Sequence, residues 1–381
     1  MTLSQAERKA ALDRLVQRVG TTLEATDERF PLYAAADGTW ETTDDGNWCA
    51  GYWIGLLWLA SKHATGATRV RFRSAAHAHL PALLAQPTGH LFAGLNHAYA
   101  GFLGYDVTGE PQLRDIGIRG ADAMLALYDA RARHIPIGTY TTAPTHKKRT
   151  SRTPIDRSNY AAVDAIHTSV PVLLRAYRET GRDAYRDAAT AHVKRHLEWH
   201  MRPDGSTTQM TTFDKATREP IDRFSTLAAS DDGCWSRGLG WHIAGLAYVC
   251  VATGDTDALA ALRISAGYYA AHAGGDLVPA WDLTLTDPLA PRDASAAAIA
   301  AYGLLSLRGA AELPDADIAD LVGMGERILG SLVRLYQVKG GANAGAIAHG
   351  CYRFPTGIAT DNELIWTDFY VAAALDLQTD G

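Results

Sequence analysis

The sequence of 381 residues has few cysteines, no long apolar run and no excess of positive charge, and each shortage excludes a class of protein. Its four cysteines (Cys49, Cys234, Cys250 and Cys351) are far apart and show no Cys-x-x-Cys spacing, which argues against a zinc site or a disulfide framework. No apolar run is long enough to cross a bilayer, and residues 1–19 have the charges of an amphipathic helix instead of the apolar stretch of a signal peptide. We therefore expect a cytoplasmic protein with no membrane contact.

The formal net charge of −6 is also the wrong sign for a nucleic-acid partner, and we expect none. Hydrophobic residues make up 47% of the chain and charged residues 20%, which is typical of a globular protein with an ample core. One basic run, residues 146–149, lies in a stretch rich in proline and threonine. We interpret it as a solvated loop, or at most as a rim that attracts an anionic substrate.

Strand-like alternation is nearly absent, whereas a helical hairpin recurs along the chain. Apolar stretches end in Thr-Gly at residues 65–66, 108–109, 180–181 and 253–254, and a fifth ends at Arg308-Gly309; a more polar stretch follows the Thr-Gly pairs. Glycine is the residue expected where a helix stops in a left-handed cap. Repeated pairs of an inner apolar and an outer amphipathic helix predict an all-α, (α/α)6 barrel, formed by residues 1–381 as a single domain.

The segment from Ser230 to Trp241 is the most specific candidate for a sugar site. Arg237 and Trp241 are four residues apart and share a helix face, so a cation and an indole are available for a uronic carboxylate and its ring. Trp235 precedes them, and Asp231 and Asp232 are expected to cap the helix that begins near Cys234. The alternative is that Arg237 only braces the barrel.

Asp164 is the strongest candidate for catalysis because apolar residues surround it at helical spacing. Burial raises the pKa of a carboxyl toward the range of a proton donor. His167, three residues later, is predicted on the same face. The alternative is a structural aspartate that caps a neighbouring helix or pairs with His167.

Two further patterns are given structural roles. His192, His196 and His200 form a stripe that could bind metal, but no carboxylate completes a ligand set, so we predict a solvated outer face and no metal. Asp293 is predicted to be the N-cap of the alanine-rich helix that follows it.

Several segments together resemble the unsaturated glucuronyl hydrolases of glycoside hydrolase family 88 and the related unsaturated rhamnogalacturonyl hydrolases of family 105. The resemblance runs from about Trp48 to Leu375 and rests on GYWIGLLWLA, VDAIHTSVPVLL, RPDGST, DDGCWSRGLGW, PAWDL, RDASAAAIAAYGLL and NELIWTDFYVAAAL. It implies an (α/α)6 barrel without metal or redox cofactor, a monomer or homodimer, and hydration of the C4=C5 double bond of a terminal unsaturated uronic residue. It also implies that Asp164 is the general acid and base, and that Trp53, Arg237 and Trp241 hold the sugar.

The sequence departs from the family pattern at three positions. The second aspartate of the family, in a His-Asp-x-Gly-Phe motif, corresponds to Leu91 or Phe92 here, or to Tyr99 in a shifted register. Gln209 stands where a histidine is usual, and Leu227 where a glutamine is usual.

His167, His97 or Tyr99 is a candidate to compensate for the missing acid. Three hypotheses follow: hydration of an unsaturated uronide, the reverse elimination as a dehydratase or lyase in making a specialised metabolite, and a catalytically silent barrel that binds sugar.

Overall fold

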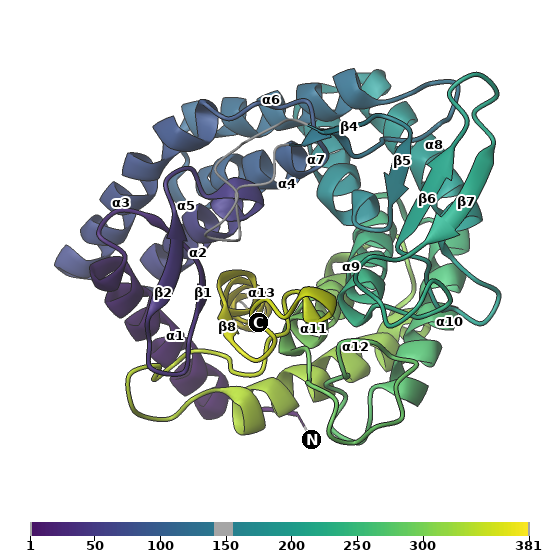
Figure 1. The fold of residues 1–381 in the computed structure, drawn as a ribbon. Helices are drawn as coiled ribbons and strands as arrows, with labels where there is room; N and C mark the ends of the chain where they lie inside the picture. The colour runs from purple at the N-terminus through teal and green to yellow at the C-terminus, as the bar shows by residue number, and fades with distance from the viewer. Residues whose placement is uncertain (1, 141–154, 380–381) are drawn as a thin grey trace.

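Two kinds of helix alternate along the chain and form an inner and an outer ring (Figure 1). The computed structural model describes residues 2–140 and 155–379, so the basic run at 146–149 lies outside the described part. The outer helices are α1 (Gln5–Ala25), α3 (Gly66–Leu84), α6 (Pro111–Leu127), α8 (Asp183–His200), α10 (Thr256–His272) and α12 (Asp315–Ser331). The inner helices are α2 (Ala50–His63), α4 (Phe92–His97), α5 (Leu103–Thr108), α7 (Ala165–Thr180), α9 (Ser236–Thr253), α11 (Ala294–Ser306) and α13 (Ile365–Asp376).

The inner ring is closed. A π-helical turn at Ala98–Phe102 joins α4 to α5, so these two make one inner element. Each inner element packs against the next, and α13 packs against α2. The predicted (α/α)6 barrel is therefore confirmed. No helix in the described ranges combines the length and apolarity needed to span a bilayer.

The inner helices are apolar around most of their circumference because neighbours cover them on every side. In α11, the sequence ASAAAIAAYGLLS is buried at nearly every position. Its small side chains let it approach α9 closely. A Cβ atom on Gly303 would lie 2.5 Å from the Cα of Ala244, so only glycine fits there.

The glycines that end three of the inner helices behave as predicted. Gly109, Gly181 and Gly254 follow α5, α7 and α9 in left-handed conformation, with φ of 76°, 70° and 64°. The prediction is wrong at residues 65–66, because α2 already ends at His63 and Gly66 is the first residue of α3. Gly309 lies in a 3-10 turn after α11.

The two ends of the chain meet at a buried ion pair. Arg18 of α1 donates from Nη2 to Oε2 of Glu363 at 2.5 Å, and both side chains are almost fully buried. Glu363 belongs to β8 (Glu363–Leu364), which pairs with β1 (Phe30–Ala34); β1 also pairs with β2 (Trp40–Thr43). This small sheet and the ion pair link the first helix to the last.

Short strands lie on the end of the barrel where the inner helices begin (Figure 1), although the sequence showed almost no strand alternation. β3 (Gly138–Tyr140) pairs with β4 (Ile155–Arg157). A second sheet has the order β5-β6-β7, formed by Tyr160–Ala162, Met210–Phe213 and Pro220–Phe224. β5 leads directly into α7, so this sheet fixes the start of an inner helix.

Candidate active site

A cavity of about 420 Å³ opens at the end of the barrel where the inner helices start. Its walls include residues at or just before the first turns of four inner helices: Trp48, Phe92, Asp164 and Trp235. The rest of the wall comes from β4–β7 and from the segment around Tyr352. The positive ends of several helix dipoles therefore point toward one space, which favours an anionic ligand.

Asp164 lies two residues beyond the end of β5, in the turn that leads into α7, and its side chain lines this cavity. Tyr160 and Ala162 of β5 line the same cavity, because alternate side chains of a strand point to one face. Although Asp164 occupies the N-cap position of α7, its side chain makes no capping hydrogen bond. Among the described residues, its carboxylate forms no hydrogen bond with His167, whose ring contacts other groups. This part of the chain therefore shows neither a helix cap by Asp164 nor a pairing with His167.

The environment of Asp164 suits a proton donor. Burial raises the pKa of its carboxyl from 3.8 to about 6, although its own backbone N–H and the charge of Arg237 oppose the rise. Within the described residues, no other side chain forms a hydrogen bond with this carboxylate. The group is thus available to a bound molecule and can be protonated near neutral pH.

Gln209 presents its amide nitrogen to the cavity. Its Oε1 accepts hydrogen bonds from the backbone N–H groups of Thr226 (2.7 Å) and Leu227 (3.1 Å) and from the hydroxyl of Ser225 (2.8 Å). These donors fix the orientation of the amide, so its N–H groups remain for a ligand. Gln209 is therefore a donor held in place by the 225–227 loop.

Arg237 has a structural role as well as a place in the cavity wall. Its side chain is only 2% exposed, and its Nη1 donates to Asp293 Oδ2 at 2.9 Å and to the Cys351 carbonyl at 2.7 Å. Its Nη2 donates to the Tyr352 carbonyl at 2.6 Å. Asp293 also caps α11 through the N–H of Ser295, as predicted. Arg237 thus braces the barrel and still contributes positive charge beside Asp164.

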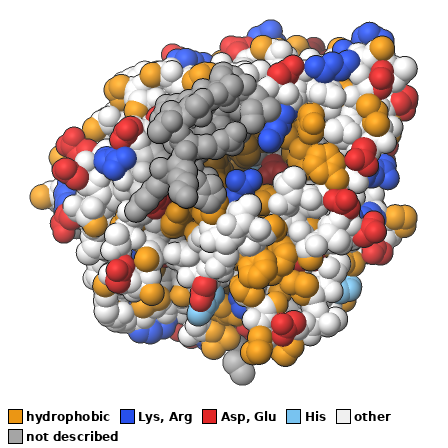
Figure 2. Space-filling model, in the orientation of Figure 1, with side chains coloured by type: hydrophobic (Ala, Val, Ile, Leu, Met, Phe, Trp, Pro, Cys, Tyr) orange, Lys and Arg blue, Asp and Glu red, His pale blue; other side chains and the backbone are white. Residues whose placement is uncertain are grey.

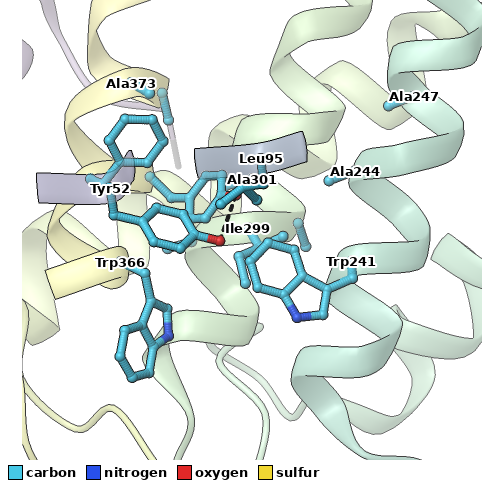
Figure 3. Close-up of a cluster of buried hydrophobic side chains, with 14 of the residues drawn as sticks. Tyr52, Leu95, Trp241, Ala244, Ala247, Ile299, Ala301, Trp366 and Ala373 are labelled. Atoms are coloured by element: carbon cyan, nitrogen blue, oxygen red, sulfur yellow. Dashed lines mark hydrogen bonds between the residues drawn. The ribbon is translucent and has the colours of Figure 1, made fainter. Parts of the chain in front are cut away.

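The aromatic floor of the cavity is formed by Trp48, Trp235, Trp241 and Tyr352. The ring of Trp235 lies against the guanidinium of Arg237, with 4.7 Å from its Cζ to the ring centroid. Trp241 belongs to the cluster of buried side chains drawn in Figure 3, where its ring centroid lies 5.6 Å from that of Tyr370. Arg237 and Trp241 both line the cavity, as their spacing indicated.

The other predicted members of the site do not line this cavity. Trp53 is fully buried in the barrel wall, where its Nε1 donates to His79 at 3.2 Å, so we withdraw it from the sugar-binding set. His97 is buried with its Nδ1 near the Ala93 carbonyl. Asp231 and Asp232 do not cap α9, because its N-cap is Trp235 and that cap has no side-chain bond.

His167 and Tyr99 lie beneath the aromatic floor. The Nε2 atom of His167 is 2.9 Å from the hydroxyls of both Tyr99 and Tyr370, and its ring stacks on Trp241 at 5.1 Å. Both residues border a separate space of about 200 Å³ farther along the inner helices. His167 supports Trp241 from below, Tyr99 contacts His167, and neither residue lines the cavity that contains Asp164.

Leu91 and Phe92 line the cavity, whereas Tyr99 does not. The residues that the first register places at the second acid therefore lie in the cavity wall, and the residue of the shifted register does not. An apolar side chain occupies this wall. No compensating acid could be inferred from the sequence, and none of the three proposed substitutes reaches the cavity.

Charged residues at the rim were not singled out from the sequence. Asp156, Arg157 and Arg353 line the cavity mouth. Figure 2 shows a hollow on this face, bordered by hydrophobic side chains and by basic ones. Asp156 accepts from the backbone N–H of Ser158, which lowers the pKa of its carboxyl. Asp156 and Arg157 belong to the three-residue strand β4 and Arg353 to a loop, and segments this short have no periodic signal from which to choose them.

The histidine stripe of α8 is buried, contrary to the prediction of a solvated face. His192, His196 and His200 meet His134 and His242, and the His196 Nε2 atom lies 2.9 Å from the His242 Nδ1 atom. Their contacts come from distant segments, namely His134 and Ile135, His242 of α9 and the carbonyl of Thr208, which periodicity within α8 could not reveal. Within the described ranges, no three His, Cys, Asp or Glu side chains are arranged to hold a metal ion.

Comparison of the sequence with known proteins gives matches over nearly the whole chain. An unsaturated chondroitin disaccharide hydrolase from Streptococcus pneumoniae is 26% identical over 98% of this chain and 92% of its own length. An unsaturated glucuronyl hydrolase from a Bacillus species is 26% identical over 91% of this chain and 90% of its own length. No family model matches the chain.

Comparison of the fold gives the same group of proteins. The crystal structure of the unsaturated glucuronyl hydrolase from Streptococcus agalactiae superposes with a TM-score of 0.86 at 23% identity, covering 100% of this chain and 94% of that one. The enzyme from Bacillus sp. GL1 superposes with a TM-score of 0.84 at 23% identity, covering 97% and 96%. These structures establish the architecture of the barrel.

Proposed function

We propose, on the premise that this chain is a homologue of the unsaturated glucuronyl hydrolases, that it hydrates the C4=C5 double bond of a terminal unsaturated uronic sugar. Water adds across the double bond, with hydrogen going to C4 and hydroxyl to C5. The product is a hemiketal whose ring opens, and the sugar is then released from its aglycone. No redox cofactor is needed, because the reaction adds only water.

Asp164 is the residue that carries this proposal. Its carboxyl lies in the cavity, is free of other side chains, and has its pKa raised to about 6 by burial. In the acid form it donates a proton to C4, and in the anionic form it takes one from the water that attacks C5. A pKa near the working pH keeps both forms accessible within one turnover.

The rest of the polar wall is suited to holding the uronic group. Arg237 and the starts of the inner helices provide positive potential for a carboxylate. The indole of Trp241 offers an aromatic face to the C–H side of the ring, and the amide nitrogen of Gln209 offers donors to hydroxyls. Trp235 supports Arg237 from one side.

Ultraviolet absorbance of the double bond tests the reaction class. Incubation with a panel of unsaturated uronic disaccharides is expected to reduce the absorbance, and the Asp164→Asn variant should not. A gain of absorbance with saturated uronides would instead support elimination. Tight binding with no change in either direction would support a sugar-binding barrel, which the apolar residues at Leu91 and Phe92 favour as the second candidate.

A further inference from the structure

One side of the cavity is apolar, and the mechanism proposed above does not use it. Four buried side chains and three partly buried ones form a separate hydrophobic cluster, and all of them line the cavity. We call this cluster the apolar wall: Leu91, Phe92, Ile137, Tyr160, Ala162, Met210 and Phe224.

The register of the β5–β7 strands places the side chains of the apolar wall that belong to this sheet on the face toward the cavity. Ala162 of β5 is directly opposite Met210 of β6, which is directly opposite Phe224 of β7. These residues therefore form a row across three strands on one face. Ala161, on the other face, packs with Trp199 in another cluster behind the sheet. The pleat thus separates a cavity face from a core face.

The apolar wall ends in two aromatic rings near the mouth. Tyr160 and Phe224 are only partly buried, and their rings meet edge to face with centroids 6.2 Å apart. In Figure 2, hydrophobic side chains border the hollow beside the strands of this sheet. Such rings give a flat apolar ligand contact area at a low entropic cost.

A hydroxyl-rich sugar fits poorly against this wall. Each hydroxyl placed on Leu91, Met210 or Ile137 would lose its hydrogen bonds to water without gaining others. The donors and acceptors that a sugar needs, Gln209 and Asp164 among them, are supplied by other residues of the cavity. One cavity therefore has a polar part for the uronic ring and an apolar part for what is attached to it.

We propose that the substrate of this site is an unsaturated uronide whose aglycone is an apolar ring system instead of a second sugar, with the apolar wall as the aglycone subsite. This inference rests on the proposed function. Leu91 is central to it, because this buried leucine gives the apolar wall a fully apolar surface at the cavity.

Binding to the Asp164→Asn variant tests the proposal without turnover. The probes are the 4,5-unsaturated glucuronide of 2-naphthol and a 4,5-unsaturated glucuronyl-N-acetylglucosamine disaccharide, with Kd measured by calorimetry. The naphthyl uronide is expected to bind on the order of tenfold more tightly, or better, because its rings bury apolar surface on the wall. Equal binding, tighter binding of the disaccharide, or no binding of either would overturn the proposal.

A matched pair of variants on β7 locates the subsite. Phe224→Ser, made in the Asp164→Asn background, is expected to reduce the preference for the naphthyl uronide several-fold. Ile221→Ser on the same strand is the control, because Ile221 is exposed and does not line the cavity. An unchanged preference in the Phe224 variant would also overturn the proposal. Turnover of both probes by the wild type is measured separately. If neither probe is hydrated, the proposed function fails. The ratio of the two Kd values still tests whether the apolar wall binds the aglycone.

Discussion

Replacing Asp164 by asparagine is expected to make the protein more stable while abolishing its activity. Raising the pKa of a carboxyl from 3.8 to about 6 means that its ionised form is less favourable in the folded protein than in the unfolded chain. At pH 8 the difference amounts to about 3 kcal/mol, because one pKa unit corresponds to about 1.4 kcal/mol. Asparagine is nearly isosteric and has no charge, so it removes this cost.

The stability gained by the Asp164→Asn variant is expected to increase with pH. The folded carboxyl binds its proton more tightly than the unfolded one, so the cost is absent below pH 3.8, grows as the pH rises and is complete above about 6. Urea unfolding of wild type and variant is therefore expected to differ by about 3 kcal/mol at pH 8 and by much less at pH 4. Asp156→Asn is the control, because Asp156 is exposed at the rim and the pKa of its carboxyl is lowered.

An Asp164→Asn variant that is no more stable than wild type at pH 8 would refute this reasoning. It would mean that the carboxylate has favourable partners in the folded protein or is well hydrated there. Either result would remove the physical basis for a proton donor at this position.

Three other predictions address activity, ring closure and the histidine cluster. The kcat/KM for an unsaturated uronide should fall about tenfold per pH unit above about 6, as the acid form of Asp164 in the free protein is lost; a flat profile from pH 5 to 8 would contradict this. Arg18→Ala should lower the free energy of unfolding by about 3–5 kcal/mol in urea, since it leaves Glu363 buried without its cation; a loss under 1 kcal/mol would count against a closing role for the pair. His134→Phe should stabilise the protein by about 1 kcal/mol at pH 7, because both ring nitrogens of His134 are buried without a hydrogen-bond partner in the described ranges. Burial lowers the pKa of His134, so this gain should grow as the pH falls through 6.5 and only the unfolded chain takes up the proton; thermal unfolding at pH 7 and 5.5 checks both points.

The barrel could be predicted because its signals are local and repeated. A glycine that ends a helix in left-handed conformation, as Gly181 does, acts within a few residues of its own position. The alternation of apolar and amphipathic helices follows from which helix lies inside. The short strands were missed because two to five residues give too short a pattern to separate from a loop.

The candidate site was predicted best where its residues lie at the starts of inner helices, which meet at one end of the barrel. Asp164, Arg237 and Trp241 lie at the start of inner helices, and that position brings them together. His167 shares a helix with Asp164, but it lies beneath Trp241 instead of in the cavity. The burial of the α8 histidines depends on His134 and on His242 of α9, and the apolar wall depends on a sheet made from distant strands; no single stretch of sequence reveals either.

In the proposed reaction, the carboxyl of Asp164 donates a proton to C4 of the double bond of a bound uronide. The most direct measurement is the initial rate of double-bond loss, followed by absorbance, for wild type and Asp164→Asn at saturating unsaturated uronide and pH 6. The variant is expected to lose at least about a hundredfold in kcat while remaining folded and able to bind substrate. A variant that hydrates the substrate within a few-fold of the wild-type rate would contradict the account.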